Sequence, residues 1–462
     1  MDALSGRLRS QLVDVVGAAH VLTEPDVVAG YCVDWTGRFR GATPAVVRPA
    51  STDEVAALIA LCGASEVAVV PQGGNTGLVG GGVPLGGEVV LSLRRLAVVG
   101  PVDERAGQVT AGAGSPLAAV QRSAGEAGWA YGVDFGSRDS ASVGGSVATN
   151  AGGLKVLRYG DTRAQLVGIE AVLGDGSVVS HLHGLVKDNT GYHLPSLLCG
   201  SEGTLGVVTA ARVRLVAPAP ERVVALLAFA DPAHAVDAAG ALRRSVPSLE
   251  AAELFLADGL ALVRQAAGLA APFPSPHAAY LLVEAAGRTS PMTELADGVA
   301  SLPAVADVAV AEDSVRRAEL WRYREAHTEA LNTLGPPHKL DVTLPSGRLA
   351  DFVAEVPAVV AGVAPDARTW LFGHAGDGNV HVNVTGLPLD DMAADDAVLA
   401  LVVEMGGSIS AEHGIGTAKK AWLARTRSPA ELAAFRAVKS ALDPAGILNP
   451  NVLLPAFPPA SE

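Results

Sequence analysis

Residues 369–384 read TWLFGHAGDGNVHVNV, and this stretch organises the second half of the chain. A short run of Thr and large apolar residues precedes a turn rich in Gly and Asp, which are poor helix formers. After the turn, apolar and polar residues alternate strictly, which is the period of a strand. The pattern therefore predicts a β-hairpin that brings His374 and His381 across from each other.

The alternation places the three valines of the second strand on one face and His381 and Asn383 on the other. Further along the chain, Glu412 and His413 lie in the run SAEHGIG. Two histidines and one carboxylate can hold Zn²⁺ or a related metal and leave a position open for substrate. The metal ligands would be His374, His381 and Glu412. The alternative is a pair of half-buried histidines that only hydrogen-bond within a polar hairpin, and spacing alone leaves both interpretations open.

Composition limits the class of protein. A chain of 462 residues exceeds one ordinary domain, so we expect two or three. Hydrophobic residues make up 49% of the chain but aromatic residues only 4%, which predicts a core of Ala, Val and Leu. The net charge of −14 and the lack of a long basic run argue against nucleic acid or an anionic membrane as partner.

The cysteines and the N-terminus favour a cytoplasmic protein. Cys32, Cys62 and Cys199 are scattered and form neither a disulfide framework nor a metal-binding spacing. The first residues lack an apolar signal core, and we find no run of about 18 uncharged apolar residues.

The N-terminal third predicts helices and one strand-helix-strand unit. Residues 1–30 have an amphipathic helical pattern. A short strand at 45–49 precedes a helix that begins with Ser51 and Glu54 in the register of a capping box. A second strand at 67–70 follows, so a parallel pair is expected.

Three Gly-rich segments follow, with the sequences PQGGNTGLVGGG at 71–82, GGSVATNAGG at 144–153 and GSEGTLG at 200–206. Glycine permits a close approach of the backbone, and successive N–H groups can then surround a phosphate. The alternative for the first segment is a long flexible loop. Three such segments within about 130 residues favour a long ligand lying against backbone, and a dinucleotide has that length.

These segments resemble the FAD-binding domain of the vanillyl-alcohol oxidase/p-cresol methylhydroxylase flavoproteins. Residues 374–381 and the Glu412-His413-Gly414 triplet resemble the C-terminal domain of FAD-linked 2-hydroxyacid dehydrogenases. Asp34-Trp35 and residues 71–81 are most similar to the D-2-hydroxyglutarate dehydrogenases within this superfamily. The resemblance covers nearly the whole chain, and its motifs occur in the order and spacing of the family.

The resemblance implies an α+β fold in which a two-lobed FAD-binding domain is joined to a cap domain with an antiparallel sheet and helices. Residues 1–217 would form the FAD-binding domain with its N-terminal helical segment. Residues 218–430 would form the substrate domain with the metal site, and residues 431–462 would return to the flavin. The sequence APAP at 217–220 reads as a linker.

The resemblance also implies the residues that contact FAD, which come from the three Gly-rich segments and the C-terminal tail. They are Pro71, Gln72, Gly73, Gly74, Asn75, Thr76, Gly77, Leu78, Ser142, Gly144, Gly145, Ala148, Asn150, Gly152, Gly153, Glu202, Gly203, Val207 and Asn449. Phe135 stands where related proteins often have Pro, which alters one expected flavin contact. Because no His lies within residues 71–82, we expect FAD to be bound non-covalently.

Residues 314–334 contain no Gly or Pro and predict one helix, on which Arg324 and Thr328 are neighbours at i, i+4. In the family, the matching Arg and Thr, with a Lys that corresponds to Lys339, hold the substrate carboxylates, and Asn383 belongs to the same site. An Arg fork can grip a carboxylate in bidentate fashion. The alternative is an Arg and a Lys on a solvated face.

His413 is the candidate general base, because a neutral imidazole can accept the substrate hydroxyl proton near pH 7. The expected reaction is FAD-dependent, metal-assisted oxidation of a D-2-hydroxyacid, best D-2-hydroxyglutarate or D-malate, to the 2-oxo acid. Two alternatives are a D-lactate or glycolate dehydrogenase or oxidase of the same fold, and a non-catalytic flavin-binding subunit of a larger complex. The expected electron acceptor is an electron-transfer flavoprotein or a quinone, and the chain could form a homodimer.

Overall fold

The computed structural model describes residues 4–455 and divides them into two compact units. The first unit contains residues 4–153, 159–217 and 412–455, and the second contains residues 154–158 and 218–411. The chain leaves the first unit after Ala217, within the APAP segment, and returns to it at Glu412. This return lies before residue 430, where the sequence placed the end of the substrate domain.

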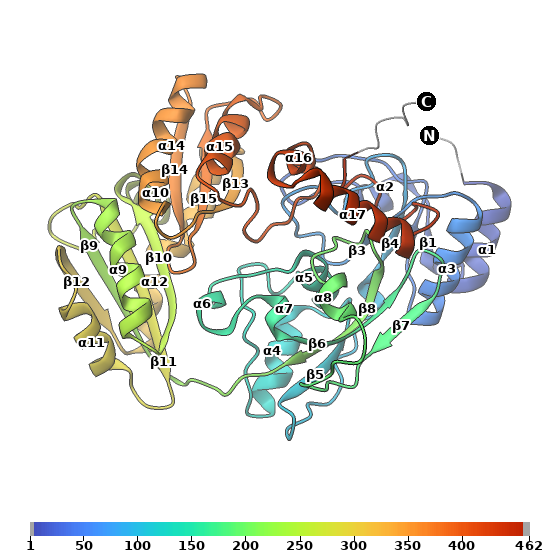
Figure 1. The fold of residues 1–462 in the computed structure, drawn as a ribbon, viewed down its shortest axis with the longest axis horizontal. Coiled ribbons are helices and arrows are strands. Elements are labelled where there is room, and N and C mark those ends of the chain that lie inside the picture. Colours follow the sequence, from blue (N-terminus) through green and yellow to red (C-terminus); the bar gives the residue numbers. More distant parts are fainter. Residues whose placement is uncertain (1–3, 456–462) are drawn as a thin grey trace. The chain divides into compact units, whose positions relative to one another are not determined.

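In its described residues the first unit has two four-stranded sheets (Figure 1). One sheet has the order β1-β2-β4-β3, with strands Val21–Leu22, Val46–Val47, Val89–Ser92 and Val69–Gln72. The other is antiparallel with the order β5-β8-β6-β7, with strands Gln108–Gly112, Val207–Arg214, Leu166–Val172 and Val178–His181. The helices are α1 (Gly6–Val16), α2 (Pro25–Val28), α3 (Thr52–Ala64), α4 (Leu117–Glu126), α5 (Val143–Thr149), α7 (Thr162–Gln165), α8 (Leu194–Leu198), α16 (Leu423–Thr426) and α17 (Pro429–Leu442). The short helix α6 (Val156–Tyr159) spans a boundary between the units.

Two expectations for the N-terminal third need correction. The strands β2 and β3 are parallel, as predicted, but they do not pair with each other, because β4 lies between them and is parallel to both. Residues 1–30 are not wholly helical, because β1 lies between α1 and α2 and pairs with β2. The helix start was predicted correctly, since Ser51 Oγ accepts a hydrogen bond from the Glu54 N–H.

The C-terminal segment completes the edge of the first sheet. The Val69 N–H donates to the Ile447 carbonyl at 2.8 Å, and the Asn449 N–H donates to the Val69 carbonyl at 2.9 Å. Lys439 Nζ donates to the carbonyls of Thr204 and Leu448 at 2.8 and 2.7 Å. These bonds fix residues 439–449 against β3 and Thr204, which are more than 200 residues earlier in the chain.

Small and branched aliphatic side chains pack the core of the first unit. Ile59, Leu117 and Ile169 are each at most 1% exposed and belong to one cluster dominated by Val, Leu and Ala. This composition matches the core expected from the scarcity of aromatic residues, whereas a core cluster of the second unit contains Phe255, Phe273, Tyr280, Trp370 and Phe372.

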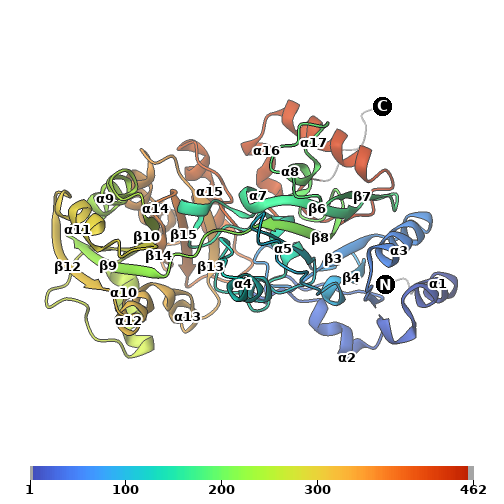
Figure 2. The same ribbon diagram turned by 90° about the horizontal axis from the view of Figure 1, so that it is seen from below.

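The second unit is built on a seven-stranded antiparallel sheet with the order β12-β9-β11-β10-β14-β15-β13. In that order the strands are Val305–Ala311, Glu221–Phe229, Ala279–Gly287, Leu249–Leu256, Arg368–His374, Asn379–Thr385 and His338–Thr343. One face is covered by α9 (Pro232–Ser245), α11 (Met292–Ala300), α14 (Leu349–Val363) and α15 (Ala393–Glu404), and the other by α10 (Ala257–Ala267), α12 (Ser314–Glu325) and α13 (His327–Asn332) (Figure 2). The predicted α+β class with an antiparallel cap sheet is confirmed.

The strands β14 and β15 form the predicted hairpin. Gly378 has φ +86°, and a Cβ on it would lie 2.6 Å from the Leu344 carbonyl oxygen, so the turn requires glycine. The residue opposite His381 is Phe372, and His374 lies two positions further along β14. The two histidines are therefore diagonal neighbours rather than direct partners.

The helix predicted over residues 314–334 is divided in two at Ala326. His327 Nδ1 lies 3.1 Å from the Arg324 carbonyl oxygen, and its ring packs against Phe255 and Phe372. Burial lowers the pKa of His327 to about 3, so this ring is neutral. Tertiary packing of His327 accompanies the break, and Arg324 and Thr328 lie on different helices instead of on consecutive turns of one.

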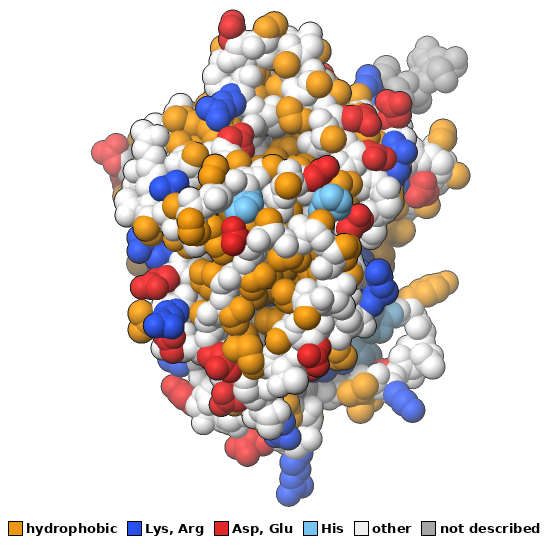
Figure 3. All heavy atoms as spheres, turned by 90° about the vertical axis from the view of Figure 1, so that its left-hand side faces the viewer, with side chains coloured by type: hydrophobic (Ala, Val, Ile, Leu, Met, Phe, Trp, Pro, Cys, Tyr) orange, Lys and Arg blue, Asp and Glu red, His pale blue; other side chains and the backbone are white. Residues whose placement is uncertain are grey.

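Strand β12 is the outer edge of the second unit's sheet. Its exposed residues alternate and include Val308 and Val310, which are 44% and 46% exposed. Figure 3 shows the face on this side, where hydrophobic side chains are interspersed with acidic and basic ones. Within residues 4–455 no helix has the length and apolar character needed to span a membrane.

Candidate functional site

A row of polar and aromatic side chains crosses one face of the second unit's sheet. The register pairs Asp341 with His381, His381 with Phe372, and His374 with Glu253. Cross-strand partners and alternate residues share a face, so these side chains lie together on the side covered by α10, α12 and α13. The ring centroids of His374 and His381 are 5.2 Å apart. The fold thus brings together the two histidines that the sequence predicts as metal ligands.

Glu253 links His374 to Arg324. Its carboxylate Oε1 lies 2.6 Å from His374 Nδ1, and its Oε2 lies 2.8 Å from Arg324 Nε. Complete burial by itself would raise the pKa of Glu253, but the charges of His374 and Arg324 outweigh burial and lower it. Glu253 was not predicted from the sequence. The available signal was a pair of glutamates inside the otherwise apolar run LEAAELFL at 249–256.

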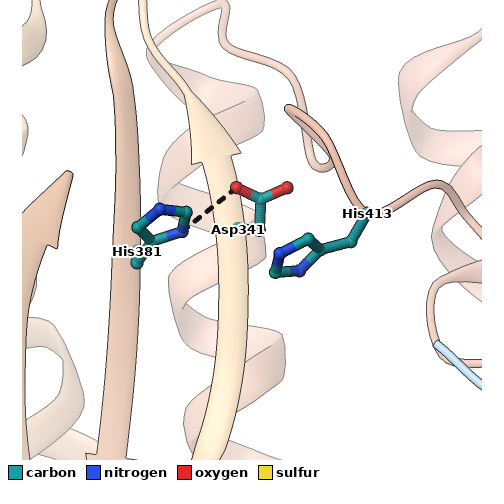
Figure 4. A group of neighbouring side chains, drawn as sticks. All are labelled: Asp341, His381 and His413. Atoms are coloured by element: carbon teal, nitrogen blue, oxygen red, sulfur yellow. Dashed lines mark ion pairs between the residues drawn. The ribbon is translucent and has the colours of Figure 1, made fainter. Parts of the chain in front are cut away.

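Asp341 is the corresponding carboxylate beside His381. Its Oδ1 lies 3.4 Å from His381 Nδ1 (Figure 4) and accepts a hydrogen bond of 2.7 Å from Asn379 Nδ2. Asp341 is fully buried in β13. It too was not predicted, although an Asp in the strand HKLDVT, two positions after Lys339, was a readable signal. Figure 4 also labels His413, which belongs to the first unit.

The predicted substrate residues lie on the same face of this sheet. Arg324 is 7% exposed, and its Cζ lies 4.6 Å from the centre of the Phe372 ring, which rules out the solvated-face alternative for this residue. Lys339 and Asn383 are cross-strand partners on β13 and β15. Burial lowers the pKa of Lys339. Thr328 is half-buried on α13.

The first unit contains a cavity of about 320 Å³. Its volume lies within the range of small-molecule and cofactor sites, roughly 300 to 1,000 Å³. All three Gly-rich segments and the C-terminal tail contribute to its wall. The predicted FAD contacts that line it are Pro71, Gln72, Gly73, Gly74, Asn75, Thr76, Gly77, Leu78, Ser142, Gly144, Gly145, Ala148, Gly152, Glu202, Gly203, Val207 and Asn449.

Asn150 and Gly153, also predicted as FAD contacts, are not among the lining residues. Asn150 ends α5 with φ +51°, and its side chain bonds to Asp161 and to the Arg163 N–H. Gly153 has φ +123° and donates its N–H to Glu412 Oε1 at 2.8 Å. Both residues shape the loop behind the cavity wall.

The cavity also has lining residues that the sequence did not single out, in particular Gly136 and Ser137 beside Phe135. They belong to a loop that precedes Ser142, the N-cap of α5, whose Oγ accepts from the Gly145 N–H. The sequence indicates the helix cap at Ser142, but no local pattern in the loop indicates that Gly136 and Ser137 face a ligand.

Two polar atoms on the cavity residues lack a partner among the described residues. They are the buried amide oxygens of Gln72 and Asn449. The amide nitrogen of Gln72 donates to the carbonyls of Tyr31 and Gly82, which fixes the direction of its oxygen. A ligand with N–H or O–H donors would satisfy both oxygens, since an unmade buried hydrogen bond is costly.

Glu412 and His413 both line this cavity. Glu202, itself buried, holds the segment that follows them, because its two carboxylate oxygens accept from the Ile415 and Gly416 N–H groups at 2.8 and 2.7 Å. Burial raises the pKa of Glu202. Glu202, which the sequence predicts as an FAD contact, therefore helps to fix the position of the candidate base His413 at the cavity.

Two family models match the chain. The FAD binding domain matches residues 43–181, and the C-terminal domain of FAD linked oxidases matches residues 219–453. D-2-hydroxyglutarate dehydrogenase of Xanthomonas citri pv. viticola is 41% identical, with 96% of each chain covered. The mitochondrial D-2-hydroxyglutarate dehydrogenase of Bos taurus is 39% identical over 94% of this chain and 81% of its own.

Solved structures agree on the fold. p-Cresol methylhydroxylase superposes with a TM-score of 0.77 over 97% of both chains at 16% identity. Alkyldihydroxyacetonephosphate synthase superposes with a TM-score of 0.76 over 98% of this chain and 87% of its own at 18% identity. The predicted p-cresol methylhydroxylase type of fold is confirmed, and the chain belongs to the FAD-linked oxidase family that includes the D-2-hydroxyglutarate dehydrogenases.

Proposed function

We propose that this protein is an FAD-dependent, metal-assisted dehydrogenase that oxidises a D-2-hydroxyacid, D-2-hydroxyglutarate or D-malate, to the 2-oxo acid. The observation that carries the proposal is the sheet face on which buried Arg324 and half-buried Lys339 accompany His374 and His381. Basic groups beside imidazoles suit a small anion with more than one carboxylate. The names of the relatives support the same substrate class.

FAD would occupy the cavity of the first unit and accept a hydride from the substrate. The glycines at its wall admit close backbone approach, and the unpartnered amide oxygens of Gln72 and Asn449 suit the N–H groups of a flavin. No His lies in residues 71–82, so we propose that FAD is released intact on denaturation.

Gly77→Ala is expected to weaken FAD binding at least about tenfold, or about 1.4 kcal/mol, without lowering the stability of the apoprotein. A Cβ at Gly77 meets no protein atom within 4 Å, so it would intrude only on a ligand in the cavity. Fluorescence titration of apoprotein with FAD gives the affinity, and thermal unfolding gives the stability.

Two further substitutions calibrate this test. Gly74→Ala would place a Cβ 1.9 Å from the Ser140 carbonyl oxygen and should lower the melting temperature of the apoprotein itself. Gly125→Ala, on the exposed side of α4, has no atom within 4 Å of the added Cβ and should change neither property. Equal FAD affinity of Gly77→Ala and the native protein would argue against a cofactor beside this loop.

The metal would be held by His374, His381 and Glu412. The donor set fits Zn²⁺ or a related ion, and each histidine has its Nδ1 beside a buried carboxylate, as metal-ligating histidines usually do. Glu412 directly follows Ala411, whose N–H bonds to the Asp341 carbonyl in the strand that pairs with His381. A divalent metal there would lower the pKa of the substrate hydroxyl.

The chain's own groups then have distinct tasks. His413 would accept the hydroxyl proton, and bound FAD would supply the acceptor for the Cα hydrogen and its electron pair, so that the carbinol carbon becomes a carbonyl. Arg324, Lys339, Thr328 and Asn383 hold and orient the substrate carboxylates. Burial of Arg324 and Asn383 would strengthen their electrostatic contacts with the anion.

The direct test is anaerobic addition of D-2-hydroxyglutarate to the FAD-loaded protein, followed by absorbance of the oxidised flavin. Bleaching within the dead time of manual mixing is expected with the D isomer and not with the L isomer. A flavin that stays oxidised with D-2-hydroxyglutarate, D-malate, D-lactate and glycolate would leave the non-catalytic flavin-binding subunit as the better account.

The diacid should be preferred to a monoacid. A monoacid would leave a desolvated basic side chain without a partner, so D-2-hydroxyglutarate or D-malate should exceed D-lactate in kcat/KM by at least about tenfold. Arg324→Ala should reduce this ratio, because it penalises the diacid more. Steady-state kinetics with a dye acceptor measure both, and Arg322→Ala, an exposed residue of the same helix, is the control. If D-lactate were the better substrate, the lactate dehydrogenase alternative would replace the proposal.

An electron-transfer flavoprotein or a quinone would reoxidise the flavin, and the rate of reoxidation after anaerobic reduction discriminates between them. The relatives are named dehydrogenases, which favours such an acceptor over O₂. The homodimer and the cytoplasmic location stay predictions from the sequence.

A further inference from the structure

Glu253 is an ionisable residue in a part of the protein that is otherwise apolar. It lies in β10, is 0% exposed, and has Ala252 and Leu254 as buried chain neighbours. Its cross-strand partner on one side is His374 and on the other Leu282. A buried carboxylate is costly unless its charge is balanced and its oxygens are used.

Each carboxylate oxygen of Glu253 faces a different group. Oε1 lies 2.6 Å from His374 Nδ1, and Oε2 forms an ion pair of 2.8 Å with Arg324 Nε. His374 comes from β14 and Arg324 from the end of α12, so a single rigid side chain sets the position of groups from two elements. Among the described residues, Glu253 is the acidic group paired with Arg324.

We propose that Glu253 is a positioning residue that couples the metal ligand His374 to the substrate-binding Arg324, and this inference rests on the proposed function. A carboxylate at Nδ1 fixes the tautomer and the ring orientation of His374, which would direct Nε2 to the metal. The same carboxylate balances the charge of Arg324 at 2.8 Å from Nε, which would leave the outer edge of the guanidinium fork for a substrate carboxylate. Glu253 would therefore fix the separation between the metal ligand His374 and the substrate-binding Arg324.

A purely structural role for a buried glutamate is seen three residues earlier. Glu250 is also 0% exposed and lies in β10, where its oxygens pair with Arg158 and Arg222 at 2.9 and 2.8 Å. It has the same charge, burial and strand as Glu253, but these ion pairs are with two arginines. Glu250→Gln is therefore a matched control for the general cost of neutralising a buried carboxylate in this strand.

The experiment measures zinc affinity of the metal-free protein by competition with a chromophoric chelator. Glu253→Gln is expected to weaken zinc binding roughly 10 to 100-fold. At saturating zinc it should also raise KM for D-2-hydroxyglutarate about tenfold, because its amide N–H groups would oppose the Nε–H of Arg324. Glu250→Gln should match the native protein in zinc affinity and KM once both proteins are shown to be folded.

Glu253→Asp serves as the test if Glu253→Gln fails to fold. It keeps the charge but shortens the side chain, so it cannot reach both partners. It should show the same weaker zinc binding and the same higher KM. Unchanged zinc affinity, or unchanged KM at saturating zinc, in a folded Glu253 variant would overturn the coupling. His374→Ala separates this from the proposed function. If His374→Ala loses zinc while Glu253→Gln does not, only the coupling is wrong. If His374→Ala still binds zinc, the proposed metal site itself is wrong.

Discussion

His413→Ala is expected to bind FAD but to reduce it with D-2-hydroxyglutarate roughly 100 to 10,000 times more slowly than the native protein. His413 lines the cavity assigned to FAD, and loss of its imidazole removes the group that accepts the hydroxyl proton. Anaerobic stopped-flow absorbance measures the reduction step alone, without the later transfer to an acceptor.

Chemical rescue makes this result specific to proton transfer. Added imidazole should restore part of the rate in His413→Ala, and the restored rate should rise with the concentration of the neutral form. His183→Ala, an exposed histidine of the first unit, should reduce its flavin at the native rate. A native rate of flavin reduction in His413→Ala would assign the base to another group.

His374→Ala is expected to keep its flavin colour and lose both bound metal and turnover, with a rate at least about 100-fold lower. The FAD cavity is lined by residues of the first unit, whereas His374 lies in β14 of the second, so loss of the metal should leave FAD bound. Metal analysis, flavin absorbance and dye-linked turnover are measured on the same preparation.

A chelator provides the matching experiment on the native protein. When the chelator removes the metal, turnover of the native protein should stop, and added Zn²⁺, Mn²⁺ or Co²⁺ should restore it. The turnover of His374→Ala should change with neither treatment. His277→Ala, another histidine of the second unit, should behave as the native protein does. Turnover that survives both chelation and the His374 substitution would make these histidines structural, as the hydrogen-bonding alternative holds.

Local patterns in the sequence predicted much of the fold. Strict alternation after a Gly-Asp turn predicted the hairpin, because the period of two is a property of every strand. The Gly-rich segments predicted most of the cavity wall, because only glycine tolerates such close contacts, as at Gly74 beside the Ser140 carbonyl.

The features that were not predicted depend on contacts between residues that are far apart in the sequence. Glu253 is 121 residues from His374, and no local pattern indicates that β10 and β14 are neighbours. The position of β4 between β2 and β3 is likewise a matter of topology. The break at Ala326 lies beside His327, whose ring packs against two aromatic rings from strands that are distant in the sequence, and helical propensity does not reveal such contacts.

The discontinuous first unit has a consequence for synthesis of the protein. Strand β3 obtains its outer hydrogen bonds from Ile447 and Asn449, and Lys439 fixes the same segment to Thr204. Residues 218–411 leave the ribosome before those partners exist, so the second unit can fold while the first is still incomplete. A chain that ends within α17 would therefore lack the segment that completes the edge of β3 and part of the cavity wall.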